Sequence, residues 1–176
     1  FKNDGDAAIA DYTKALELRP RDVETLFLRG SVLALLGRWQ GALQDFDAVT
    51  VLDPKDSVAR YNRGLAYQNL GDVDRAIADY TKAAEMDPTD PAPFVNRGLL
   101  RAGRKDYDAA IEDYDRALKA RPDFSIAHFN KAQAFELSGR LPEAVAAYRE
   151  SLKSLGPEYR AEAQRLLAEL ERRLPQ

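Results

Sequence analysis

The sequence has no cysteine, one histidine, one tryptophan and one methionine among its 176 residues. The absence of cysteine excludes disulfides, thiolate catalysis and cysteine-based zinc sites. A single histidine leaves little room for a histidine-based metal site or catalytic triad. The net charge of −3 argues against a nucleic-acid binder that works through bulk electrostatics. No uncharged stretch approaches the roughly 20 apolar residues that a membrane-spanning helix needs.

What the sequence does contain is a 34-residue period that runs along the whole chain without insertions. Proline, alanine, an aromatic residue and glycine each recur in a fixed column. The columns are Pro20, Pro54, Pro88 and Pro122; Ala8, Ala42, Ala76, Ala110 and Ala144; Tyr12, Phe46, Tyr80, Tyr114 and Tyr148; and Gly30, Gly64 and Gly98, followed by Ala132. Such a period predicts a stack of small structural units that bury their apolar faces against one another.

These columns resemble the tetratricopeptide repeat, and the resemblance covers nearly every residue. The clearest copy begins at residues 59–67 (Ala-Arg-Tyr-Asn-Arg-Gly-Leu-Ala-Tyr). The sequences Asp-Tyr-Thr-Lys-Ala and Asn-Arg-Gly are similar to those of bacterial members. The resemblance implies an all-α, right-handed superhelical solenoid of antiparallel helix pairs. The departures are Val49 for alanine, Lys105 for the mid-repeat glycine and Gly156 for the last proline.

The period divides the chain into a partial repeat, four full repeats and a final helix. We expect residues 1–22 to be the second helix of a truncated repeat and residues 159–176 to be a capping helix. The four full repeats are expected at 23–56, 57–90, 91–124 and 125–158. The expected cap has an apolar stripe of Ala163, Leu166, Leu167, Leu170 and Leu174 opposite a charged face. Because the chain opens in mid-repeat, we expect that it was cut from a longer protein, or that its open end meets another molecule.

A row of asparagines is the main candidate for a binding site. When each full repeat is numbered from 1, positions 2, 6, 9 and 13 share one face of the first helix. Position 6 holds Leu28 and then Asn62, Asn96 and Asn130. By resemblance to the family, this face lines a concave groove, and similar asparagines in the peptide-binding arm of O-linked N-acetylglucosamine transferase hold an extended peptide. An amide can donate and accept, so it suits a peptide backbone; the alternative is that asparagine only fills the position.

Apolar residues accompany the asparagines at positions 5 and 9. We expect side-chain pockets of the groove to be lined by Tyr61, Leu65, Val95, Leu99 and Phe129. Gln133, at position 9 of the last repeat, is also expected to bind the peptide. The alternative for Phe27, Tyr61 and Phe129 is packing between helices. The basic residues with which some family members grip the carboxylate of a chaperone tail do not stand at the matching positions. A co-chaperone function of that kind is therefore disfavoured.

Charged columns predict ion pairs between successive repeats. Position 7 holds a basic residue and position 23 an aspartate in most repeats. The pairs predicted from this spacing are Asp11–Arg29, Asp45–Arg63, Asp79–Arg97 and Asp113–Lys131. The alternative is a row of arginines that binds an anion. His128 at position 4 is expected to be a packed side chain.

The sequence predicts a non-catalytic scaffold that binds an extended peptide segment of a partner protein in the concave groove. We expect no cofactor, no metal, no nucleic-acid partner and no membrane span. Two alternatives stay open: a substrate-targeting arm of a larger enzyme such as a glycosyltransferase, and a scaffold that self-associates through its uncapped N-terminal repeat. The sequence does not assign a cell compartment, although a cytoplasmic location is slightly favoured over a periplasmic one.

Overall fold

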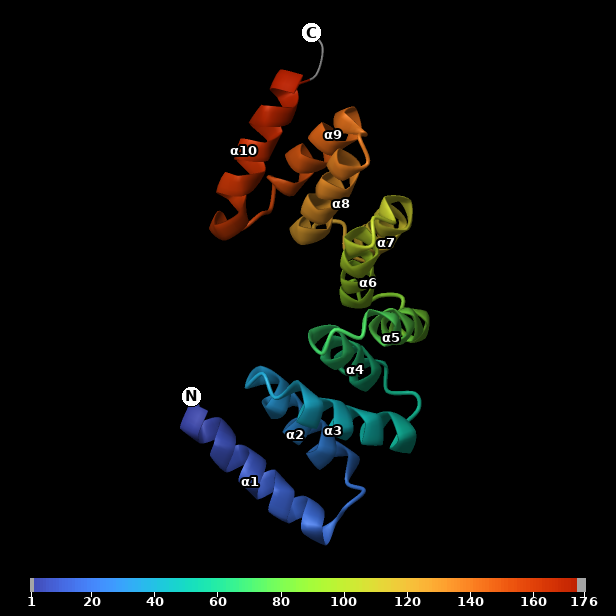
Figure 1. Ribbon diagram of the computed structural model, residues 1–176, viewed down its shortest axis with the longest axis vertical. Coiled ribbons are helices and arrows are strands. Elements are labelled where there is room, and N and C mark those ends of the chain that lie inside the picture. Colours follow the sequence, from blue (N-terminus) through green and yellow to red (C-terminus); the bar gives the residue numbers. More distant parts are fainter. Residues whose placement is uncertain (1, 174–176) are drawn as a thin grey trace. The chain divides into compact units, whose positions relative to one another are not determined.

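The computed structural model describes residues 2–173, and the regular structure within them is entirely helical (Figure 1). The helices are α1 (Lys2–Leu18), α2 (Val23–Leu35), α3 (Trp39–Leu52), α4 (Ser57–Asn69), α5 (Val73–Met86), α6 (Ala92–Gly103), α7 (Tyr107–Ala120), α8 (Ser125–Leu137), α9 (Leu141–Ser151) and α10 (Pro157–Arg173). Phe1 at the open end and Leu174 of the expected cap lie outside the described residues.

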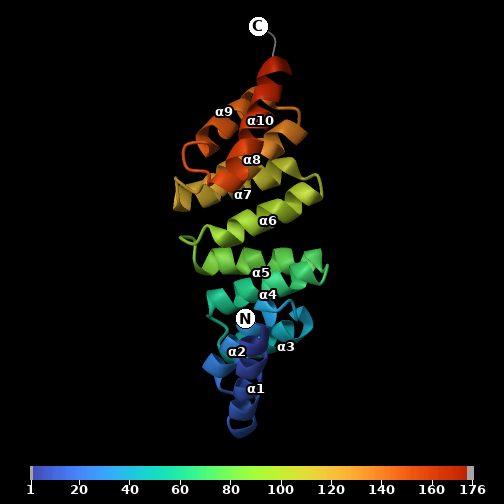
Figure 2. The same cartoon turned by 90° about the vertical axis from the view of Figure 1, so that its left-hand side faces the viewer.

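The helices form two compact units, one with α1–α5 and one with α6–α10. In the first unit α2 packs on α3 and α4 on α5, while α1 covers α2 and α3 contacts α4. In the second unit α6 packs on α7 and α8 on α9, α7 contacts α8, and α10 covers α9 (Figure 2). Each helix pair falls within one 34-residue period of the sequence.

Aspartates fix where several helices begin. The carboxylates of Asp22 and Asp56 accept hydrogen bonds from the backbone N–H groups of Thr25 and Ala59, which have no partner inside the helix. Asp72 and Asp106 cap the second helices α5 and α7 in the same way. These aspartates stabilise the starts of α2, α4, α5 and α7.

The turn within each pair requires a left-handed backbone residue. Gly37, Gly71 and Gly139 have φ angles of 72°, 82° and 81°, which glycine adopts without steric cost. In the third pair the turn residue is Lys105, whose φ of 64° places a long side chain in the same conformation. The departure from the glycine column therefore changes the residue and keeps the turn.

The glycine and aromatic columns form one packing device. A Cβ atom built on Gly98 would lie 2.7 Å from Cε1 of Tyr114, and one on Gly64 would lie 2.9 Å from Cε1 of Tyr80. The aromatic ring of each second helix thus lies directly against the backbone of the first. Tyr80 and Tyr114 are almost completely buried. Glycine is needed here because a side chain would displace the ring.

The described residues of the apolar stripe on α10 are buried or half-buried. Ala163 and Leu170 are completely buried, and Leu166 and Leu167 are half-buried. The charged face is exposed, and Arg149 of α9 binds Glu171 at 2.6 Å.

Candidate functional site

The candidate site is the face of the first helices at repeat positions 2, 6, 9 and 13, which we name the position-6 stripe. It runs along α2 and α4 in the first unit and along α6 and α8 in the second. Within each unit the two first helices contact each other, so their stripes lie side by side. The side chains of the first unit are Glu24, Leu28, Ser31, Leu35, Val58, Asn62, Leu65 and Asn69. The residues of the stripe in the second unit are Ala92, Asn96, Leu99, Gly103, Ile126, Asn130, Gln133 and Leu137.

Exposed apolar side chains gather on the position-6 stripe. Nine large hydrophobic residues are exposed in the part of the chain that the structure describes, and five of them lie on this stripe. They are Leu28 (39% exposed), Leu35 (75%), Val58 (54%), Leu99 (42%) and Leu137 (63%). Folding usually buries such side chains, and clusters of exposed ones mark surfaces that bind other molecules.

The three asparagines differ in exposure. Asn62 of α4 and Asn96 of α6 are half-buried, whereas Asn130 of α8 is 7% exposed. The Nδ2 atom of Asn62 donates to the carbonyl oxygen of Val58 at 3.0 Å. This bond uses one of the four hydrogen-bonding positions of the amide. Asn96 and Asn130 lie in one compact unit and Asn62 in the other.

The residues at position 5 pack against the second helix of their own pair. The ring centroid of Phe129 lies 5.7 Å from that of Tyr148, and the centroids of Tyr61 and Tyr80 are also 5.7 Å apart. Phe129 and Val95 are buried, with 4% and 5% of their surface exposed. These contacts match the alternative of helix packing that the sequence left open, and they leave Tyr61 as the more accessible of these three predicted pocket residues.

Position 9 supplies the accessible members of the predicted set. Leu99 is exposed, and Leu65 and Gln133 are half-buried. The predicted residues did not include Leu35 and Leu137, which are the most exposed apolar side chains of the stripe. The sequence could have predicted both leucines, because position 13 lies on the same helical face as positions 2, 6 and 9.

The position-7 cations and position-23 aspartates do pair, but within one repeat. Two parallel hydrogen bonds join Arg29 to Asp45 at 2.8 and 2.6 Å. Arg63 holds Asp79 in the same way, and Arg97 binds Asp113 at 2.5 to 3.2 Å. The predicted partners Asp11–Arg29, Asp45–Arg63 and Asp113–Lys131 are therefore wrong. The fourth predicted pair, Asp79–Arg97, would join the two units, and each of its residues binds a partner within its own unit. Each of the three arginines pairs with the aspartate sixteen residues ahead.

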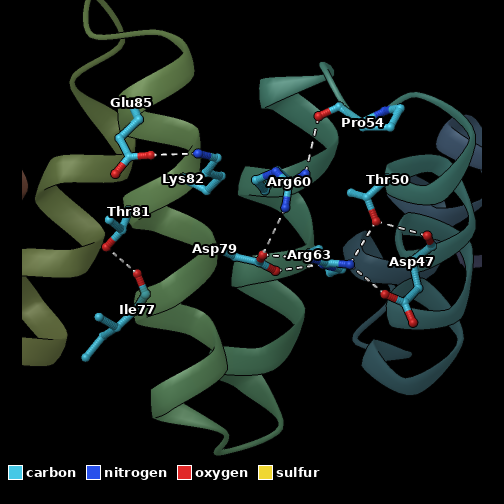
Figure 3. A network of polar contacts seen from close by, with 10 residues as sticks. All are labelled: Asp47, Thr50, Pro54, Arg60, Arg63, Ile77, Asp79, Thr81, Lys82 and Glu85. Carbon is cyan, nitrogen blue, oxygen red and sulfur yellow. Dashed lines mark hydrogen bonds and ion pairs between the residues drawn. The ribbon is translucent and has the colours of Figure 1, made fainter.

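Position-7 cations also contact the preceding repeat, at an aspartate two residues after the predicted one. The Nη1 atom of Arg63 donates to Asp47 at position 25 of the preceding repeat, at 2.7 Å, and to Thr50 at 2.8 Å (Figure 3). Lys131 binds Asp115 at the same pair of positions, at 2.5 Å. Hydrogen bonding to the Asp79 carboxylate is the main cause that raises the pKa of Arg63 above its usual value. These arginines are occupied by the protein itself, which argues against the alternative of an anion-binding row.

His128 departs from the expected packed position. It is half-buried, its Nε2 atom lies 3.1 Å from the carbonyl oxygen of Pro122, and its ring lines an open cavity between α8 and α9. Across residues 2–173, no group of three histidine, cysteine or acidic side chains is arranged to hold a metal ion. The described helices include none with the length and hydropathy to cross a membrane.

One family model for the tetratricopeptide repeat matches residues 2–57 and 95–160, and a second model for the same repeat matches residues 57–90. No curated protein matches the chain at a significant level.

Several solved structures share the fold. The crystal structure of the MamA protein is 28% identical, with a TM-score of 0.82, over 92% of this chain and 87% of that chain. A MamA structure from Desulfovibrio magneticus is 22% identical, with a TM-score of 0.73, over 99% and 90%. YrrB, described as a TPR protein with an unusual peptide-binding site, is 18% identical, with a TM-score of 0.78, over 93% and 84%. The repeat columns, the all-α helix pairs and these matches agree, and the chain belongs to the tetratricopeptide repeat family.

Proposed function

We propose that this protein-interaction scaffold binds an extended segment of a partner protein along the position-6 stripe. The observation that carries the proposal is the gathering of exposed leucines and a valine on that stripe, with half-buried asparagine amides between them. Apolar pockets take side chains from a linear segment, while amides pair with its backbone whatever the side chains are. The description of YrrB as a peptide-binding TPR protein is in keeping with this function.

The apolar residues contribute affinity, and the amides contribute orientation. Covering Leu35 or Leu137 removes apolar surface from water, at about 25 cal/mol for each Å². A backbone amide of the partner that lost its water would need a new hydrogen-bond partner, and Asn62 or Asn96 supplies one. We propose that the chain performs no catalysis itself, in keeping with the binding role of its family.

A peptide-library screen against the wild type and designed variants tests this function. The first variant replaces Leu35 and Leu137 by serine, and the second replaces Asn62 and Asn96 by alanine. Leu35 and Leu137 are exposed and the two asparagines are half-buried, so the fold should be kept, as circular dichroism would verify. Selected peptides should bind the leucine variant at least tenfold more weakly, and the asparagine variant several-fold more weakly.

The control is Gln40→Ala, which removes an exposed amide from α3, away from the stripe. It should bind like the wild type. If the library yields no binder, or if all three variants bind as the wild type does, the proposed groove is wrong.

A further inference from the structure

The network around Arg63 shows how many carboxylates a position-7 cation can hold. Arg63 binds Asp79 from the second helix of its own repeat and Asp47 from the second helix of the preceding repeat (Figure 3). The side chain of Asp79 is 7% exposed and that of Asp47 is 55% exposed. One cation therefore joins an inner carboxylate and an outer one.

The repeat at 125–158 has the cation without the inner carboxylate. Lys131 occupies position 7 and binds the outer carboxylate, Asp115, at 2.5 Å. Position 23, which is aspartate in the three preceding repeats, is Ala147. Lys131 also lies over the ring of Phe135, with Nζ 5.4 Å from the ring centroid. The place of the inner carboxylate in this repeat is thus taken by a methyl group.

A cavity of about 490 Å³ opens at this place. Lys131, Phe135 and His128 line it from α8, and Ala147 and Arg149 line it from α9. Residues 128, 131 and 135 follow one another at helical spacing and lie on the face of α8 opposite Asn130. The cavity is therefore separate from the position-6 stripe.

The other charges around the cavity already have partners. Arg149 binds Glu171 at 2.6 Å, and Glu150 binds Lys153 at 2.7 Å. Glu143 binds Arg140 at 3.1 Å. Lys131 differs from these residues because its counterparts in the preceding repeats also bind a carboxylate at position 23.

We propose that the cavity binds an acidic side chain of a partner protein, with its carboxylate on Lys131 where the preceding repeats place their own aspartate. The chain itself supplies the template, since Asp45, Asp79 and Asp113 make this contact inside the protein. A charge-assisted hydrogen bond from Lys131 fixes the partner's carboxylate, and the ring of Phe135 packs against the methylene groups of the same acidic side chain. The volume exceeds that of one aspartate side chain, so it also admits the residues beside it.

The test for a ligand uses His128, which is the single histidine of the sequence and lines the cavity. Its ring proton signals are followed by NMR at constant pH while peptides are added. The probes are an acetylated and amidated Gly-Asp-Gly peptide, its Gly-Asn-Gly twin, and succinate as a free dicarboxylate. The Asp peptide should shift the His128 signals in a saturable way, and the Asn twin should cause at least tenfold weaker saturation. Absence of a shift with the Asp peptide, equal shifts with the twin, or tighter binding of succinate would each overturn the proposal.

Two substitutions at Ala147 test the site without a ligand. Ala147→Asp supplies the carboxylate of the preceding repeats, and Ala147→Asn supplies the same shape without charge. The aspartate variant should unfold at a higher temperature than the asparagine variant, and it should no longer respond to the Asp peptide. Lys131→Gln should abolish the response while circular dichroism shows an intact fold. Equal unfolding temperatures for the two Ala147 variants, or an unchanged response in Lys131→Gln, would overturn the proposal.

Discussion

Arg63 of α4 holds Asp79 of α5 through two parallel hydrogen bonds of 2.7 and 2.8 Å. Both side chains are largely removed from water, so neither charge can recover its hydration if the other is lost. We predict that Asp79→Asn lowers the free energy of unfolding by about 3 kcal/mol, because the largely buried guanidinium then keeps only the carboxylate of Asp47, which is more than half exposed. Urea denaturation followed by circular dichroism measures this.

The matched control is Asp47→Asn, which removes the other carboxylate on the same arginine. Asp47 is more than half exposed, so its loss should cost under about 1 kcal/mol. Equal losses in the two variants would show that burial does not set the strength of these pairs.

A second prediction concerns the contact between Gly98 and Tyr114. Gly98→Ala places a Cβ atom 2.7 Å from a ring that is itself buried and cannot move freely. We expect a loss of about 1–3 kcal/mol in unfolding free energy, as for overpacked cores. Gly103→Ala in the same helix is the control, because its Cβ would meet nothing within 4 Å. That variant should be neutral or slightly more stable; a similar loss in both would argue against the steric explanation.

The third prediction concerns Lys105, which holds a left-handed backbone conformation at the turn where the other pairs have glycine. That conformation costs a residue with a Cβ atom about 1–2 kcal/mol, and a glycine would avoid this cost. The greater freedom of glycine in the unfolded chain offsets part of what is gained. Lys105→Gly should therefore stabilise the protein by up to about 1 kcal/mol. Thermal unfolding by calorimetry checks this. Lys105→Ala keeps the Cβ atom and should give no such gain, and a gain in that variant would refute the explanation.

The fourth prediction concerns alkaline pH. Burial raises the pKa of the Tyr114 hydroxyl well above its usual value of about 10. The folded protein therefore keeps this proton at pH values where the unfolded chain has lost it. The resulting stability is fully present below about pH 10 and falls by up to about 1.4 kcal/mol per pH unit above it. Urea denaturation between pH 8 and pH 11 should show a shallower fall for Tyr114→Phe; parallel curves would contradict the assignment.

The sequence predicts the helix pairs and the fold because its strongest signals are local. Asp22 and Asp56 act as caps through bonds three residues away, and Gly71 forms its turn through its own φ angle. The partners of the charged columns were predicted wrongly for a different reason. A 34-residue period allows Arg63 to pair with Asp79, sixteen residues ahead, or with Asp45, eighteen behind. Only packing in three dimensions distinguishes these two partners.

The candidate site was predicted in part for the same reason. The helical period places Leu99 and Asn62 at matching positions of their own helices, where Leu99 is exposed and Asn62 is half-buried. The burial of Asn130 could not be predicted in this way, because it depends on how the helices pack around it and not on its position along α8. The cavity at Ala147 could not be predicted, because the sequence does not show which aspartate the preceding repeats place beside their position-7 cation.

The packing of each helix against its neighbours in the chain also has a consequence for folding speed. Within each unit the main helix contacts join consecutive helices, and the α2–α4 and α6–α8 contacts join helices one pair apart. Nearly every contact therefore joins residues that are close in the sequence, and the loss of conformational entropy on forming it is small. Helical proteins with such local contacts fold in microseconds to milliseconds, about a thousandfold faster than β-sandwiches of similar stability. Each unit should accordingly recover its structure within milliseconds after local unfolding, beginning at any one of its helix pairs.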